Sequence, residues 1–166
     1  MLTTQEKIHF LKDIPTFGSL SPEQIEKLAD LCETQTFSSS CHIFRQGDLG
    51  SSLYIVVEGR VAIEREITDE TDTVSLTIVK PHQYFGEMSL FYDAPRSVTA
   101  TAMQETLLMQ IRRDRFVAFA RQYPDLLVEL NHILSQRLVE AYDKVAEITR
   151  SRKPRELRKL YEKLEF

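Results

Sequence analysis

The chain has 166 residues, of which 42% are hydrophobic and 28% charged, and its formal net charge is −4. This length is enough for one domain with its own core, and the composition is that of a globular rather than a disordered protein. The mild negative charge argues against a general nucleic-acid-binding protein. No apolar run approaches the roughly 20 residues of a membrane span, and the N-terminus lacks a signal-peptide core, so we expect a cytoplasmic protein without a membrane span.

The N-terminal part of the chain is predicted to be helical. Apolar residues recur at helical spacing between residues 8 and 14, and Pro15 ends that pattern. A second helix is predicted to begin after Ser21, whose hydroxyl can accept from free backbone N–H groups. Gln24 completes the spacing of a capping box.

From Thr36 the sequence changes to short runs rich in β-branched and aromatic residues, separated by turn signals. The runs cover residues 43–44, 53–57, 61–63, 74–79, 98–102 and 107–111. Many short strands at even spacing predict an antiparallel sandwich or barrel. The acidic and polar segment 68–72 is predicted to be a solvated hairpin tip.

The C-terminal part returns to helical signals. Asp114 is expected to cap a short helix, and Pro124 to start a longer one. Along the longer helix the apolar residues follow heptad spacing: Leu134, Leu138, Ala141, Val145 and Ile148. This seam could pack on the same chain or pair with the same helix of a second chain. Pro154 interrupts the pattern, and the charged segment 155–166 could form one more short helix.

The segment from residue 85 to residue 100 carries the most specific chemistry. Gly86 lacks a side chain and lets a ligand approach the backbone, and the residues after it can open a short helix whose N–H groups attract an anion. Glu87 can accept from a ribose hydroxyl. Arg96 offers a permanently charged fork to a phosphate, and the hydroxyl of Ser97 follows it. Together these residues predict a site for a nucleoside monophosphate.

The same segment resembles the phosphate-binding cassette of the cyclic-nucleotide-binding domain family, which includes the bacterial catabolite activator and the protein kinase A regulatory subunit. The shared pattern is Phe-Gly-Glu, an apolar residue, a small residue, Leu, a variable stretch, then Arg and a small residue. Two more stretches match in the right order. They are residues 43–59, with Gly47 and Gly59 at tight turns, and the N-terminal helix at 11–17. The resemblance covers roughly residues 8–149.

The resemblance implies an α+β, mainly β fold. Its centre would be an antiparallel β-roll, jelly-roll-like or double-stranded β-helix, at 36–112. N-terminal helices at 4–34 and C-terminal helices at 114–149 would flank the roll, and the long C-terminal helix would be a lid or dimer helix. Residues 1–149 would then form the domain, followed by a short basic tail at 150–166.

The candidate ligand-binding residues follow from the same resemblance. They are Phe85, Gly86, Glu87, Met88, Ser89, Arg96, Ser97, Val98 and Tyr142. Glu87 would bind the ribose and Arg96 the cyclic phosphate. In the catabolite activator a Thr-Ser pair on the long helix contacts adenine, and the matching positions here are Ala141 and Tyr142. Tyr142 could stack on the base instead, in this chain or in a partner. The expected bound effector is cAMP or cGMP, and of the two we favour cAMP.

Metal and enzyme chemistry have little support. Cys32 and Cys41 fit neither a CxxC pair nor a zinc framework. The histidines are scattered without ligand spacing: His9, His42, His82 and His132. No nucleophile elbow supports a Ser-His-Asp hydrolase. We therefore expect no metal and no enzyme activity.

The function predicted from the sequence is a regulatory sensor whose C-terminal helices move when a cyclic nucleotide binds. The alternative is a fold of this family that has lost its ligand and serves as a protein–protein interaction scaffold. The expected partners are a second copy of the chain, through the helix at 125–148, and a downstream protein that the sequence does not identify. DNA binding is not expected, because only the basic tail supports it and about 16 residues after Arg150 are too few for a helix-turn-helix module.

Overall fold

The computed structural model describes residues 2–67, 73–91 and 94–150. Two predicted features, the hairpin tip at 68–72 and the tail helix at 155–166, lie outside these residues. The chain divides into two compact units, Met1–Leu126 and Leu127–Phe166. The first unit holds the β-roll and all of the candidate ligand-binding residues except Tyr142.

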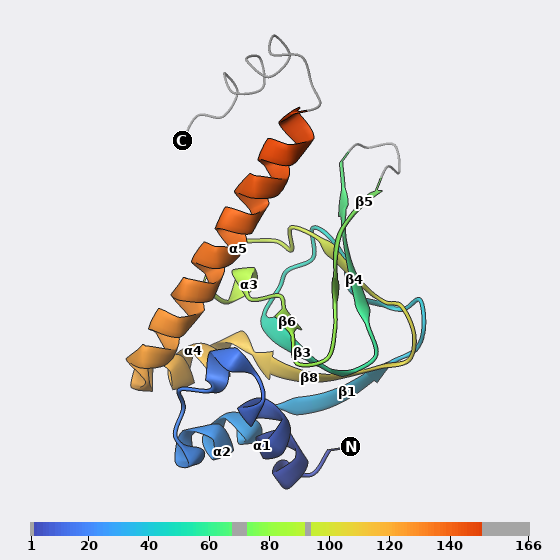
Figure 1. Ribbon diagram of the computed structural model, residues 1–166. Helices are drawn as coiled ribbons and strands as arrows, with labels where there is room; N and C mark the ends of the chain where they lie inside the picture. The colour runs from blue at the N-terminus through green and yellow to red at the C-terminus, as the bar shows by residue number, and fades with distance from the viewer. Residues whose placement is uncertain (1, 68–72, 92–93, 151–166) are drawn as a thin grey trace. The chain divides into compact units, whose positions relative to one another are not determined.

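The first unit opens with three short helical elements: α1 (Thr4–Lys12), the 3₁₀ helix η1 (Pro15–Phe17) and α2 (Pro22–Leu31). The capping box predicted at the start of α2 is confirmed, because Ser21 and Gln24 bond to each other's backbone N–H groups. Helices α1 and α2 pack on each other, and α2 also contacts α4 (Figure 1). The ammonium group of Lys27 reaches the Tyr123 hydroxyl, 3.3 Å away, at the end of α4.

Among the described residues, eight strands form two four-stranded antiparallel sheets. Figure 1 shows how the strands are arranged. The first sheet has the order β1 (Glu33–Phe37), β8 (Thr106–Arg112), β3 (Ser52–Glu58) and β6 (Tyr84–Phe85). The second has the order β2 (His42–Phe44), β7 (Thr99–Ala102), β4 (Val61–Glu66) and β5 (Thr73–Val79). The antiparallel β-roll is thereby confirmed, and each predicted apolar run lies in a strand apart from Val98, which immediately precedes β7.

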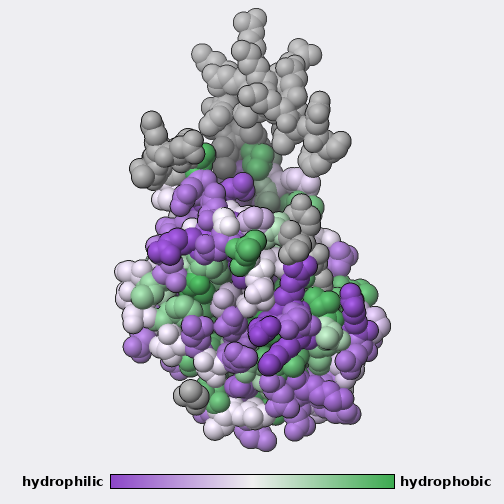
Figure 2. All heavy atoms as spheres, turned by 180° about the vertical axis from the view of Figure 1, so that it is seen from behind, coloured by the Kyte–Doolittle hydropathy of each residue, from purple (hydrophilic) through white to green (hydrophobic). Residues whose placement is uncertain are grey.

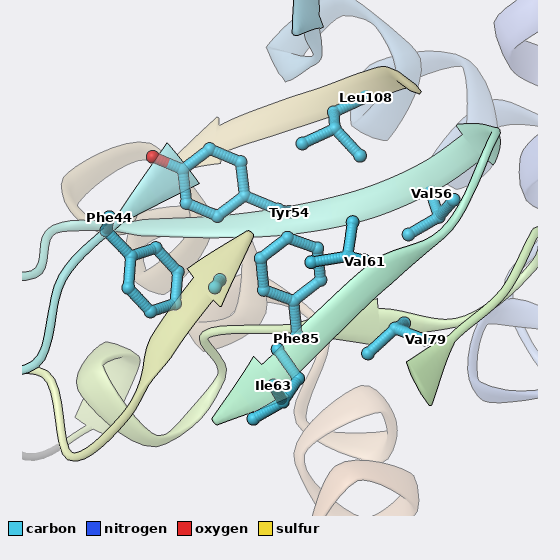
Figure 3. Packing of buried hydrophobic residues seen from close by; sticks show 9 residues of the cluster. Phe44, Tyr54, Val56, Val61, Ile63, Val79, Phe85 and Leu108 are labelled. Carbon is cyan, nitrogen blue, oxygen red and sulfur yellow. The ribbon is translucent and has the colours of Figure 1, made fainter. Parts of the chain in front are cut away.

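The core of the roll lies between the two sheets, because its cluster of buried side chains draws on both. Its members are Phe44, Tyr54, Val56, Val61, Ile63, Val79, Phe85, Ala100 and Leu108. Figure 3 shows three aromatic rings of this cluster, from β2, β3 and β6, lying close to one another. Residues of β3 that are not in the cluster, such as Leu53 and Ile55, are also buried, so both faces of this strand are covered.

The cap expected at Asp114 was wrong. Helix α4 (Arg113–Gln122) follows β8 without a break, so Arg112 occupies the N-cap position and makes no capping bond with its side chain. Asp114 lies in the first turn, where its carboxylate accepts hydrogen bonds of 3.1 and 3.2 Å from the Arg112 guanidinium. A negative charge still suits this end of the helix, because the helix dipole is positive there.

The long helix α5 (Pro124–Arg150) begins at the predicted proline, and most of it belongs to the second unit. On the seam predicted from heptad spacing, Leu138 and Val145 are exposed. Figure 2 shows a face on which hydrophilic residues predominate, with smaller hydrophobic areas among them. Within the described ranges, no helix combines the length and the apolar character needed to cross a membrane.

Candidate functional site

The predicted cassette occupies the turn between β6 and β7. Gly86 follows β6 with φ at +82°, a backbone conformation that favours glycine. A Cβ atom at this position would lie 2.8 Å from Nη1 of Arg96 and 3.0 Å from the carbonyl oxygen of Ser52. Close packing therefore demands glycine here, in addition to the backbone conformation. The short helix α3 (Met88–Phe91) starts two residues later, as the sequence predicted.

Arg96 points into the first unit and is only 4% exposed. Its Nη1 donates to the carbonyl oxygen of Gly86 at 3.1 Å and to the Ser89 hydroxyl at 3.2 Å. Its Nη2 donates to the carbonyl oxygen of Ser52 at 2.8 Å. These bonds tie the arginine to Gly86 and Ser89 of the cassette and to the start of β3. The side chain is thus held in place rather than free in solvent.

One donor of this guanidinium has no acceptor among the described residues. The Nε atom of Arg96 is buried and makes no hydrogen bond. A buried donor without a partner costs free energy, on the order of 1–3 kcal/mol. It is therefore a position at which an additional acceptor would be stabilising.

Aromatic rings line the guanidinium. Its Cζ atom lies 4.1 Å from the centre of the Phe44 ring and 5.8 Å from that of Tyr54. Burial lowers the pKa of Arg96, while the charges of Tyr54, Glu87 and Asp48 act in the opposite direction. The pKa of Tyr54 is raised, chiefly by burial. The cation is therefore partly desolvated, which strengthens its attraction for an anion.

Glu87, the expected ribose ligand, is 7% exposed and interacts electrostatically with Arg96. Its carbonyl oxygen accepts a 2.9 Å bond from the N–H of Leu90, which is part of the first turn of α3. The structure thus brings an acid and an arginine together at one turn. A carboxylate can accept from a sugar hydroxyl, and a guanidinium beside it can donate to a phosphate. The pair therefore matches the two polar parts of a nucleotide.

The loop between β2 and β3 closes against the cassette. The N–H of Gly47 donates to the carbonyl oxygen of Arg96, and the N–H of Arg96 donates to that of Asp48, each at 2.8 Å. Leu49 and Pro95 form an isolated antiparallel bridge beside these bonds. Two of the three stretches that carried the resemblance are therefore neighbours in the fold, although Gly47 and Arg96 are 49 positions apart in the sequence.

The remaining predicted residues differ in their surroundings. Phe85 is buried in the roll, and Val98 packs against the core cluster. Met88 and Ser97 are exposed at the cassette, Met88 by 66%. Tyr142 lies in the second unit and is 54% exposed, so its stacking on a base stays a prediction.

Three groups that contact Arg96 at this site could not be predicted from the sequence. The Ser52 carbonyl carries no sequence signal, because any residue could supply it. Phe44 and Gly50 stand in the stretch that resembles the family, yet nothing in the sequence indicates that both lie against Arg96. Among the described residues, no group of three or more His, Cys, Asp or Glu side chains is arranged to hold a metal ion.

Comparison with known proteins defines the class. The family model for the cyclic nucleotide-binding domain matches residues 34–123, more than half of the chain. The chain belongs to this family, and its β-roll is the fold of the family.

Individual proteins similar to this chain belong to the same class. The cyclic AMP receptor protein of Thermus thermophilus is 33% identical over 79% of this chain and 60% of its own length. A regulatory subunit of cAMP-dependent protein kinase from Dictyostelium discoideum is 34% identical over 67% of this chain and 33% of its own length. The crystal structure of the T. thermophilus catabolite activator protein superposes with a TM-score of 0.74, at 31% identity over 81% of this chain and 63% of its own. The chain thus spans less than two thirds of the length of the receptor protein and of the kinase regulatory subunit.

Proposed function

We propose that this chain is a cyclic-nucleotide sensor, which binds a cyclic nucleoside monophosphate at the cassette and does no chemistry on it. The observation that carries the proposal is the buried Nε–H of Arg96, which lacks an acceptor in the described chain. A phosphate oxygen would satisfy this donor and bring a counter-charge to a desolvated cation. Family membership supports the same kind of ligand.

In this proposal Arg96 binds the cyclic phosphate together with the backbone of the Gly86–Ser89 turn and the Ser97 hydroxyl. Glu87 accepts from the ribose 2′-hydroxyl. Arg96 and Glu87 are both buried, so their bonds to a ligand would be little screened by salt. Met88 is exposed and offers an apolar contact beside them.

We favour cAMP over cGMP as the effector. The relative from T. thermophilus is described as a cyclic AMP receptor protein, and the one from D. discoideum as part of a cAMP-dependent kinase. The hydroxyl of Ser97 would also suit the amino group of guanine, which keeps cGMP in the test. Tyr142 would supply a stacking surface for either base.

The signal would pass from the cassette to the C-terminal helices. The Nε of Arg113, the first residue of α4, donates a 2.9 Å bond to the carbonyl oxygen of Leu90 in α3. A shift of α3 would therefore pull on the start of α4 and on the helix that follows it. The ligand must bind the shifted form more tightly for this to occur. Hydrogen–deuterium exchange over 113–150, with and without cAMP, tests the idea, and identical exchange would contradict it.

The binding proposal is tested by isothermal titration with cAMP and cGMP. Arg96→Lys keeps the positive charge but loses the planar guanidinium, and Glu87→Gln loses the carboxylate. Both should weaken binding by about tenfold or more. Arg112→Lys is the matched control, because the Arg112 side chain is exposed and pairs with Asp114, which is not a cassette residue. Saturable binding that is weakened in both cassette variants supports the proposal. Failure of the unaltered chain to bind either nucleotide would contradict it.

The scaffold alternative is favoured by one observation. The chain itself supplies partners for Nη1 and Nη2 of Arg96, so much of the site is satisfied from within. If neither nucleotide binds, the roll would serve as a support for a protein that docks on the C-terminal helices. A pull-down in which the Arg96→Lys variant captures the same partner as the unaltered chain would favour this reading.

We further propose that the chain forms a homodimer through α5. The seam residues Leu138 and Val145 are exposed, at 52% and 53%. A second α5 would bury them in a coiled-coil contact. In sedimentation experiments Leu138→Lys should produce monomers. Glu140→Lys introduces the same lysine on an exposed position outside the seam and should leave the dimer intact. A monomeric unaltered chain would contradict the proposal.

A further inference from the structure

The guanidinium of Arg96 lies against two residues that carry no charge. Phe44, at the end of β2, presents its ring 4.1 Å from the Cζ atom. Gly50, in the loop between β2 and β3, lies so near that an added Cβ atom would be 2.7 Å from Cδ and from Cζ, and nearer still to Nε. Neither residue belongs to the predicted ligand contacts.

The backbone does not explain why position 50 is glycine. Gly50 has a φ angle outside the left-handed region, so an L-amino acid could adopt its conformation. The closest conflict of a side chain would be with the arginine, because the three atoms nearest to an added Cβ all belong to Arg96. A methyl group at position 50 would therefore push the guanidinium away, and the hydrogen bond from Nη2 to the Ser52 carbonyl would be strained or lost.

Phe44 acts on the same group through its ring. It is a buried member of the core cluster, with its ring 5.9 Å from that of Tyr54 and 5.8 Å from that of Phe85. These neighbours restrict the ring, so it offers the cation a fixed face. A cation over an aromatic face is attracted by the ring quadrupole, and the attraction grows when the pair is shielded from water, as it is here.

We propose that Phe44 and Gly50 are positioning residues for Arg96, which hold its guanidinium in one place and so set the affinity of the site for a phosphate group. The inference rests on the function proposed above and adds two residues that act through Arg96 rather than through contact with the nucleotide. Holding a binding group in place before the ligand arrives reduces the ordering that binding requires, and so raises affinity.

The test compares cAMP affinity among variants under conditions in which circular dichroism shows each to be folded. Phe44→Leu should weaken binding roughly three- to thirty-fold, the range expected for loss of a desolvated cation–π contact. Phe44→Tyr keeps the aromatic face and should bind cAMP with an affinity within about twofold of that of the unaltered chain. Ile63→Val removes a methyl group from the same core cluster without changing an aromatic ring, and should leave affinity unchanged.

For Gly50 the variant is Gly50→Ala, expected to weaken binding by about tenfold. Gly18→Ala is the control, because Gly18 has helical backbone angles and its added Cβ would meet only the Pro15 carbonyl oxygen, at 3.3 Å. The double variant Phe44→Leu/Gly50→Ala should lose less than the sum of the two single losses, because both changes act on one guanidinium.

The outcomes separate this inference from the function on which it rests. Failure of the unaltered chain to bind cAMP or cGMP overturns the sensor proposal and this inference with it. Binding by the unaltered chain that Phe44→Leu and Gly50→Ala leave unchanged overturns this inference alone. A loss in Phe44→Leu that Phe44→Tyr shares, or that Ile63→Val matches, also overturns it, because the effect would then reflect core packing.

Discussion

The Nη2 atom of Arg96 donates a 2.8 Å hydrogen bond to the carbonyl oxygen of Ser52, a residue 44 positions earlier in the chain. This bond joins the cassette to the first residue of β3, the strand whose side chains are buried on both faces. The acceptor is a backbone atom, so its position depends on the strand and not on a side chain. The arginine proposed to bind a phosphate is therefore also part of the packed interior.

A first prediction follows from that double role. Arg96→Glu should lower the free energy of unfolding by about 3 kcal/mol or more, because it places a carboxylate among the carbonyl oxygens of Gly86 and Ser52. Arg96→Lys should cost less, since the charge keeps its sign. Urea denaturation of the two variants measures the difference. Equal stability of Arg96→Glu and the unaltered chain would show that the side chain is not packed as described.

A second prediction compares two turn glycines with almost the same backbone angle. Gly47 and Gly59 have φ angles of +88° and +90°. A Cβ atom at Gly47 would meet nothing within 4 Å, whereas at Gly59 it would contact the Thr106 side chain and lie 2.7 Å from the Glu105 carbonyl oxygen. Gly47→Ala should cost about 1–2 kcal/mol for the backbone strain alone.

Gly59→Ala should cost clearly more, about 3 kcal/mol or above, because backbone atoms of β8 and its preceding turn cannot move aside. The difference between the two unfolding free energies isolates the steric contribution. Equal costs would contradict the packing of the Gly59 turn against residues 105–106.

A third prediction concerns thiol reactivity. Cys41 is exposed, whereas Cys32 is buried and desolvation raises the pKa of its thiol to about 12. The reactive form is the thiolate, so Cys32 should stay protonated and unreactive at about pH 8. A thiol reagent should modify one cysteine per folded chain and both in denaturant. Rapid modification of both in the folded chain would contradict the burial of Cys32.

Much of the fold could be predicted from the sequence, because its signals are local. The capping box of Ser21 and Gln24 is a pattern of side chains three residues apart, and the strands with strong β-branched runs are equally visible. Strand β1 lies in the polar sequence Glu33–Phe37, and its pairing with β8 decides its structure rather than its own composition. Strand β6 is only two residues long, so its pairing with β3 also decides its structure, and it could not be predicted from its own sequence.

The site could be predicted only in part. Gly86, Glu87 and Arg96 follow a recognisable order, and the structure brings them together. The inward direction of Arg96 could not be foreseen, because it depends on carbonyl oxygens and on the ring of Phe44, which long-range packing supplies. The cap expected at Asp114 failed because β8 continues into α4 without an intervening turn.

The most direct test of the account is a titration of the purified chain, freed of bound nucleotide by unfolding and refolding, with cAMP and with cGMP. The account predicts saturable binding at one site per chain, tighter for cAMP, weakened by about tenfold or more in Arg96→Lys and unchanged in Arg112→Lys. No binding of either nucleotide to a correctly folded chain would contradict the account, as would binding that Arg96→Lys leaves intact.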